Sequence, residues 1–201
     1  MSTISSAQQA GALRWPGAAG RARPAGQATP AGQATPSRTA GREVTPGMLA
    51  AHGFLRGMPR EQLARLAPAA SLVTIPARTR LFEDGGYATR FWLIRSGSVA
   101  LDLHVPGKGW AIIETIGLGQ VVGWSWLFPP YTWAFGAVTL QQTEAFEFDG
   151  PAVRALCDTD PALGYQVTRR FLTVLAHRLQ ATRLRLLDQR DVSGRDRPDT
   201  Y

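Results

Sequence analysis

Hydrophobic residues in the middle of this chain follow a spacing of two. Between Ser71 and Phe148 they recur in short alternating runs, and pairs such as Gly85-Gly86 and Ser96-Gly97 separate these runs. Alternation bounded by turn residues is typical of half-buried strands. Because no helix-length pattern comes between the runs except near residues 124–128, we predict an antiparallel roll or barrel. The predicted strands are Leu72–Ile75, Arg80–Phe82, Phe91–Ile94, Ser98–His104, Trp110–Ile116, Phe135–Leu140 and Ala145–Phe148.

Helical spacing flanks the strands on both sides. Before them, Thr45-Pro46 pairs an N-cap residue with proline at the first helical position, and residues 58–66 continue with a second helix. After them, Asp149-Gly150-Pro151 begins a short helix, and Asp160-Pro161 begins a long one that runs to about Asp188. The expected fold class is therefore mainly β with flanking helices and one long C-terminal helix.

The long helix carries two apolar stripes. One repeats at alternating steps of three and four residues, which is the spacing of a coiled-coil seam. The other stripe, formed by Val167, Phe171 and Val174, points elsewhere and is expected to cover the roll. We predict a homodimer through the first stripe; a helix buried on both sides within one chain is the alternative. The seam consists of Leu172, Leu175, Leu179, Thr182 and Leu186.

The N-terminal segment differs from the rest in composition. Residues 1–44 are rich in Ala, Gly, Pro, Thr and Gln and repeat the sequence PAGQAT at 24–29 and 30–35. Such a segment buries too little apolar surface to offset its ordering entropy, so we predict a disordered arm. A sensor domain at 45–157, a dimerisation helix at 158–190 and a flexible tail at 191–201 complete the division.

The net charge of +7 belongs to the two ends of the 201-residue chain. Residues 1–47 and residues 168–201 each contribute +4, whereas the middle contributes −1. Basic ends around a neutral middle are weak support for a nucleic-acid surface. No apolar run is long enough to cross a membrane, no secretory signal is visible and Cys157 is the single cysteine, so we expect a cytoplasmic protein.

Catalytic and metal-binding chemistry is not indicated. His52, His104 and His177 are far apart without ligand spacing, and the chain has neither a phosphate-binding glycine-rich loop nor a nucleophile elbow. We therefore expect no catalytic residues, no metal site and no enzymatic activity.

Two segments of the roll resemble a known family. They are Pro76–Gly86 and Phe91–Val99, and their turn glycines at 85 or 86 and at 97 are joined further on by glycines at 119 and 123. From about residue 54 to 188 the chain is similar to cyclic-nucleotide-binding domains of the catabolite activator (Crp-Fnr) type. The resemblance implies a jelly-roll-like β-roll that works as a regulatory sensor.

The same resemblance places a ligand cassette in the middle of the roll. In the family a Gly-Glu pair opens a short helix, and an arginine about ten residues later neutralises the cyclic phosphate. Here Trp124 stands at the acid position and Thr132 or Trp133 at the arginine position, while the helix N-terminus after Gly123 is expected to keep free N–H groups. The candidate ligand residues are Gly119, Gly123, Trp124, Ser125, Trp126, Thr132, Trp133 and Ala134.

Without the arginine, we expect weakened affinity for a cyclic nucleotide, because one charge-assisted contact contributes about 1.5–3 kcal/mol. No cofactor is certain. Two alternatives stay open: the tryptophans fill the empty pocket, or they bind a flat or apolar ligand. The first makes the protein a ligand-free interaction scaffold, and the second makes it a small-molecule sensor that signals to an unknown protein partner through its C-terminal helix.

The end of the long helix bears on two further expectations. Thr182 corresponds to the position that, in the catabolite activator branch, faces the base of a bound nucleotide across the dimer; a tolerated small residue in the seam is the alternative. Only Gln189 to Tyr201 follow the helix, which is too short for a helix-turn-helix, so no DNA partner is expected. No membrane partner is expected either.

Overall fold

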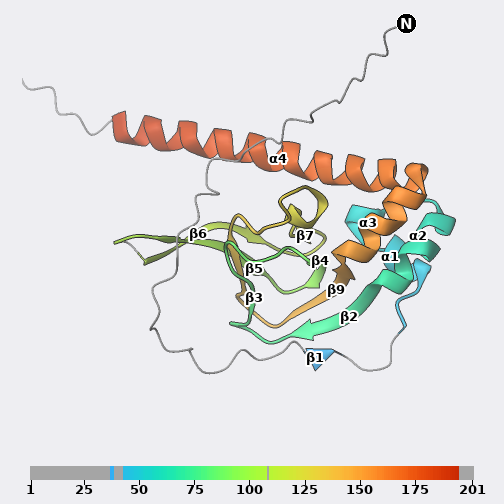
Figure 1. Ribbon diagram of the computed structural model, residues 1–201. Coiled ribbons are helices and arrows are strands. Elements are labelled where there is room, and N and C mark those ends of the chain that lie inside the picture. Colours follow the sequence, from blue (N-terminus) through green and yellow to red (C-terminus); the bar gives the residue numbers. More distant parts are fainter. Residues whose placement is uncertain (1–36, 39–42, 108, 195–201) are drawn as a thin grey trace, which may run out of the picture. The chain divides into compact units, whose positions relative to one another are not determined.

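The computed structural model describes residues 37–38, 43–107 and 109–194 (Figure 1). Its strands are β1 (Ser37–Arg38), β2 (Ala70–Ile75), β3 (Arg80–Phe82), β4 (Arg90–Ser96), β5 (Val99–Val105), β6 (Gly109–Ile116), β7 (Val121–Val122), β8 (Gly136–Thr139) and β9 (Thr143–Asp149). Its α-helices are α1 (Pro46–Ala50), α2 (Arg60–Leu66), α3 (Gly150–Thr159) and α4 (Pro161–Gly194), and its 3₁₀ helices are η1 (Gly53–Leu55), η2 (Ala67–Ala69) and η3 (Ser125–Leu127).

The strands form two antiparallel sheets, which confirms the predicted roll. One sheet has the order β1-β2-β9-β4-β7 and the other the order β3-β8-β5-β6. In the first sheet β4 lies between β9 and β7: its Leu93 lies opposite Phe146 of β9 on one side and opposite Val121 of β7 on the other. All seven predicted strands are present, with ends that differ by a few residues.

Strand β4 is buried on both faces, since helices cover the outer face of its sheet. Phe91 faces the helices, where its ring centroid lies 5.6 Å from that of Phe171 in α4. The next residue, Trp92, faces the inside of the roll and stacks on Phe82 of β3. Successive side chains of a strand point to opposite faces, so this strand bridges the roll core and the helical layer.

The helix starts are those expected from the sequence. The hydroxyl of Thr45 accepts a hydrogen bond from the amide of Met48 at 3.3 Å, which caps α1. Asp149 accepts from the amide of Ala152 at 2.8 Å at the start of α3. Asp160 accepts from the amide of Leu163 at 3.1 Å at the start of α4. Each side chain thus satisfies a backbone donor that has no partner inside its helix.

Helix α4 presents its two apolar stripes to different surroundings. Val167 and Phe171 are buried against the core, and Val174 packs at its edge. By contrast, Leu172 and Leu179 are 64% and 53% exposed. Figure 1 shows α4 running alongside the roll and continuing beyond its helical layer. The stripe of Val167, Phe171 and Val174 thus packs against the rest of the domain, and the use of the other stripe as a dimer seam stays a prediction.

Two strands of two residues each were not predicted, because so short a segment has no detectable period. One is β7, which pairs with β4. The other is β1, which pairs with Val73 and Thr74 of β2 and falls inside the predicted disordered arm. Residues 37–38 thus pair with the sheet, while the disorder of the arm stays a prediction. The rest of that arm, apart from residues 43–44, lies outside the described residues, as do residues 195–201 of the predicted tail.

The turn between β4 and β5 depends on the absence of a side chain at Gly97. This residue has a φ of 81°, and a Cβ placed there would lie 2.6 Å from the Thr143 hydroxyl oxygen and 2.8 Å from the Thr143 Cα. Gly85 has a similar φ of 77°, but a Cβ there would meet nothing within 4 Å.

We predict that Gly97→Ala destabilises the protein more than Gly85→Ala, as measured by urea unfolding. Both substitutions place a Cβ in the left-handed region, at about 1–2 kcal/mol. Only Gly97→Ala adds a steric conflict with backbone, which contributes a further ~1–3 kcal/mol. Equal losses of unfolding free energy in the two variants would contradict the packing at Gly97.

Candidate functional site

The predicted ligand residues lie along one segment between β6 and β8, and backbone bonds tie its beginning to β4. The amide of Gly119 donates to the carbonyl of Ile94 at 2.9 Å, and the amide of Ile94 donates to the carbonyl of Gln120 at 2.9 Å. The Gly119 amide is therefore occupied within the sheet and is not free for a ligand.

At the centre of the cassette, Gly123 lies directly against the ring of Trp133. Gly123 has a φ of 86°, and a Cβ there would lie 2.9 Å from the Cη2 atom of Trp133. A glycine is needed at this position both for the left-handed backbone and for the close approach of the ring. The Trp133 ring thus occupies the space next to the turn that begins the short helix.

Backbone hydrogen bonds hold Trp133 in this place. Its amide donates to the carbonyl of Gly86 at 2.9 Å, and its carbonyl accepts from the amide of Gly85 at 2.9 Å. The neighbouring Thr132 forms an isolated antiparallel bridge with Tyr87. The segment of Thr132 and Trp133 is consequently fixed to the loop between β3 and β4, with the indole directed inward.

Inside the roll the indole of Trp133 completes an aromatic cluster. Its ring centroid lies 3.8 Å from that of Phe82 at an interplanar angle of 16°, and 6.4 Å from that of Trp92. Only 5% of Trp133 is exposed. Stacked rings contribute about 0.5–1.5 kcal/mol beyond their area burial. Of the two alternatives for the aromatic residues, this geometry favours a filled pocket.

The other candidate residues do not gather around a common space. Trp126 is fully buried in the helical layer, with its ring 4.6 Å from Phe91 and 5.5 Å from Phe171, so it is a core residue rather than part of a pocket wall. Trp124 is half-buried, Ser125 is buried and Ala134 is exposed.

The short helix is reduced to the three residues of η3. Its internal bond joins the amide of Leu127 to the carbonyl of Trp124 at 3.0 Å. One turn of 3₁₀ helix has too few aligned peptides for an N-terminal anion site of the kind expected from the sequence. A guanidinium does approach η3, but Arg154 of α3 donates to the carbonyl of Trp126 and lies over the ring of Tyr131. It therefore does not face the amides after Gly123.

The seam residues of α4 are placed as follows. Leu172, Leu179 and Leu186 are exposed, and Leu175 is half-buried. The hydroxyl of Thr182 donates to the carbonyl of Arg178 at 2.9 Å, one turn earlier in the same helix. This hydroxyl is thus satisfied by its own helix in the isolated chain.

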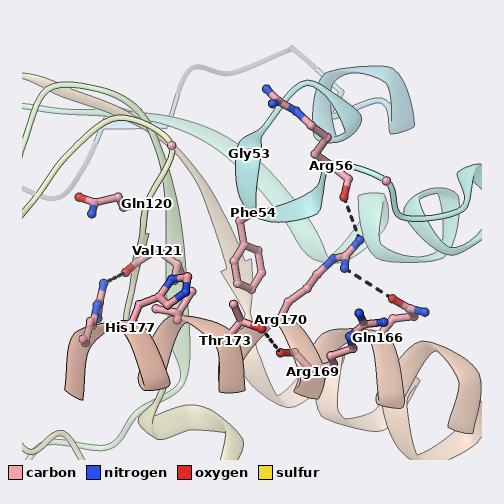
Figure 2. Close-up of a pocket in the computed structure, with 14 residues that line it drawn as sticks. Gly53, Phe54, Arg56, Gln120, Val121, Gln166, Arg169, Arg170, Thr173 and His177 are labelled. Carbon is pink, nitrogen blue, oxygen red and sulfur yellow. Dashed lines mark hydrogen bonds between the residues drawn. The ribbon is translucent and has the colours of Figure 1, made fainter. Parts of the chain in front are cut away.

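A second site, which the sequence did not indicate, lies between η1, the start of β7 and α4. It is a cavity of about 680 Å³, and we name it the arginine groove. Figure 2 shows the ring of Phe54 in its middle, directed from η1 toward α4. Its lining residues are Gly53, Phe54, Arg56, Gly57, Gly119, Gln120, Val121, Gln166, Arg169, Arg170, Thr173, Val174, His177 and Arg178.

His52 fixes the η1 wall of this groove. One ring nitrogen, Nε2, lies 3.0 Å from the carbonyl of Ile94, and the other, Nδ1, accepts from the amide of Phe54 at 3.2 Å. These partners require the neutral ring with its proton on Nε2. Burial lowers the pKa of His52, and the nearby Arg95 lowers it further against the opposing effect of the Ile94 hydrogen bond.

Two arginines of α4 are partly desolvated in the groove. Burial lowers the pKa of Arg178 below its ordinary value, which the neighbouring Glu114 partly offsets. Burial also lowers the pKa of Arg170, and repulsion from Arg169 adds to the effect. The Arg169-Arg170 pair followed by Arg178, on a helix that returns over the first helices, is the sequence signal that could have identified this groove.

Part of the roll is similar to a known family. Residues 72–160, somewhat less than half of the chain, match the sequence model of the family described as cyclic nucleotide-binding domain. Together with the jelly-roll architecture, this match confirms the resemblance seen in the sequence.

A curated relative supports the same assignment. The chain is 27% identical over 150 residues to the CRP-like cAMP-activated global transcriptional regulator of Mycobacterium tuberculosis (strain CDC 1551 / Oshkosh). The match covers 74% of this chain and 65% of the relative, so the chain spans less than two thirds of that relative's length. Because this relative is named a transcriptional regulator, the expectation that DNA is not a partner finds no support here.

Solved structures share the fold. A cyclic nucleotide-binding domain from Methylobacillus flagellatus is similar with a TM-score of 0.60 at 23% identity, covering 66% of this chain and 74% of that one. The catabolite activator protein of Thermus thermophilus gives a TM-score of 0.54 at 22% identity, covering 67% and 61% of the two chains.

The described residues show no sign of a membrane span or of a metal site. No helix among them is both long enough and apolar enough to span a bilayer. No group of three or more histidine, cysteine, aspartate or glutamate side chains gathers there in a way that suits a metal ion.

We predict that Trp133→Ala lowers the unfolding free energy by about 3–5 kcal/mol, because it leaves a cavity in the aromatic cluster. Trp110→Ala is the matched control: Trp110 is 57% exposed, and its contact with Arg80 contributes at most about 1 kcal/mol. Thermal and urea unfolding measure both changes. A loss at Trp133 no larger than that at Trp110 would show that the cassette is not filled.

Proposed function

We propose that this protein is a non-enzymatic regulator whose roll is closed to cyclic nucleotides and whose output is helix α4, acting as a homodimer on a protein partner. The single observation that carries this proposal is the Trp133 ring, which is stacked on Phe82 and lies against Gly123 in the cassette. The regulatory character is supported by the domain family and by the Crp-like relative.

Two free-energy terms oppose a cyclic nucleotide in the cassette. Displacing the Trp133 ring loses packing worth about 3–5 kcal/mol, as for deletion of a buried aromatic side chain. The arginine that neutralises the phosphate in the family is replaced, which removes about 1.5–3 kcal/mol more. At 1.4 kcal/mol for each tenfold change in affinity, the two terms lower the affinity by at least about three powers of ten.

Helix α4 supports the output role. Its roll-facing residue Phe171 is buried, while Leu172, Leu179 and Leu186 form an outward leucine stripe. Exposed apolar stripes of this length mark interaction surfaces on small proteins. A second copy of α4 is the occupant we propose, since the three-four spacing suits a coiled-coil partner of the same sequence.

The sensor alternative, with a flat ligand among the tryptophans, is less well supported. Trp126 belongs to the core between Phe91 and Phe171, and Trp133 occupies the space that such a ligand would need. The cytoplasmic location stays a prediction.

We predict that cAMP and cGMP, which carry a single phosphate charge, leave the thermal stability of the full chain unchanged. A ligand present at about a hundred times its dissociation constant adds ~2.7 kcal/mol, so differential scanning fluorimetry would detect binding readily. Hydrogen exchange of the backbone amides then shows which residues a bound ligand protects. A stabilisation by cAMP that protects the amides of residues 123–126 would overturn the closed cassette.

We predict that Leu179→Gln shifts the protein from dimer to monomer in sedimentation equilibrium. Each buried leucine contributes about 1.5–3 kcal/mol, and a symmetric dimer loses two, so the dissociation constant rises at least ~100-fold.

Leu184→Gln is the matched control for this substitution. Leu184 is 63% exposed, but at about 100° per residue it lies ~140° around α4 from Leu179, away from the seam. A monomeric unmodified protein, or dissociation by Leu184→Gln alone, would contradict the seam.

A further inference from the structure

The arginine groove carries positive charge that the described residues do not neutralise. The guanidinium of Arg170 donates to the carbonyl of Arg56 at 3.0 Å and to the amide oxygen of Gln166 at 3.5 Å, and both acceptors are uncharged. Its Nε is buried without a hydrogen-bond partner in the described structure. Figure 2 shows this side chain extending from α4 across the groove toward η1.

Arg169 adds a second such charge at the rim of the groove. Its side chain is exposed and forms no ion pair with a described residue. Arg178 differs, because it donates to the carbonyl of Val121 at 2.5 Å and lies 3.5 Å from a carboxylate oxygen of Glu114. Arg178 therefore joins α4 to the roll, whereas Arg169 and Arg170 have capacity for an anion from outside.

The lining residues reinforce this charge. They include four arginines and one histidine and no aspartate or glutamate. Bringing such a group of cations together is unfavourable without an anion, particularly where Arg170 is partly desolvated. The cavity of about 680 Å³ lies within the range of small-molecule sites, roughly 300–1,000 Å³. A ligand of moderate size with several negative charges fits both properties.

We propose that the arginine groove binds a small phosphorylated molecule of the nucleoside diphosphate or triphosphate class. Guanidinium groups match phosphate oxygens in pairs of parallel hydrogen bonds, so Arg169 and Arg170 hold the phosphates. The ring of Phe54, in the middle of the groove, offers the apolar surface on which a base can stack. No cysteine, aspartate or glutamate lines the groove, so it offers neither a thiol nor a carboxylate to a cationic ligand.

The groove stays accessible in the proposed dimer. Gln166, Thr173 and His177 face the groove and lie about 120–160° around α4 from the seam residue Leu179. It is also separate from the cassette, where Trp133 fills the roll. Binding in the groove therefore does not require an open cassette. Arg169, however, lies only about 80° around α4 from Leu179, so this rim residue borders the proposed dimer seam.

The test is isothermal titration calorimetry of the full chain with ATP and, as the probe without a base, inorganic pyrophosphate. We expect both to bind, ATP more tightly because of the stacking surface, and binding to weaken with ionic strength. Arg170→Gln weakens both by about tenfold or more, since it removes a charge-assisted contact.

Arg169→Gln guards against the possibility that Arg170→Gln disturbs folding, because the Arg169 side chain is exposed and unpaired with described residues. We expect it to weaken ATP binding several-fold with unchanged thermal unfolding. Arg185→Gln removes the same charge from an exposed position of α4 outside the groove and changes the affinity less than about twofold.

Two results would overturn the proposal. One is the absence of heat with ATP and pyrophosphate at low ionic strength. The other is binding that Arg170→Gln, Arg169→Gln and Arg185→Gln weaken equally, which would show a diffuse charge effect rather than a site. Hydrogen exchange protection at residues 123–126, which do not line the groove, that survives Arg170→Gln would instead report binding in the cassette. A failure of the groove proposal is therefore distinct from a failure of the proposed closed roll.

Discussion

The contact between Phe171 of α4 and the aromatic residues of the roll is the constraint on which the other features depend. Its ring lies 5.6 Å from that of Phe91 and 5.5 Å from that of Trp126, and Phe91 in turn stacks on Phe148 of β9. Because these rings are buried, α4 has one rotational setting about its axis. That setting turns Leu172 and Leu179 outward on one side and Arg170 into the groove on the other.

Most of the fold could be predicted from the sequence, since the signals were local. The runs with a period of two and the glycines between them predicted the roll. The capping residues Thr45, Asp149 and Asp160 predicted three helix starts correctly. What could not be predicted depends on long-range pairing. The strand β7 has only two residues, and it exists because Leu93 and Trp92 of β4 provide a partner.

The candidate site was predicted less completely, for a physical reason. The sequence showed that the phosphate-binding arginine was replaced, but side-chain direction decides whether a tryptophan lines a pocket or fills it. Trp126 and Trp133 are seven residues apart in one segment, yet the first packs in the helical layer and the second inside the roll. The groove could not be predicted in the same way, because it forms only where α4 passes η1, and no local sequence pattern specifies that arrangement.

The groove and the cassette are linked by one short stretch of backbone. Gly119 and Val121 line the groove, and Gly123, two residues further, contacts the ring of Trp133. The carbonyl of Val121 also accepts the hydrogen bond of Arg178, so the same stretch is tied to α4. An anion held by Arg170 would change the field at Arg178, and any weakening of the bond to Val121 would loosen α4 from the roll. A ligand shifts the position of α4 only if it binds two positions of the helix with different affinity, and the bond between Arg178 and Val121 is one contact through which such a difference can arise. Under the proposed function, the groove is therefore better placed than the filled cassette to control the output helix.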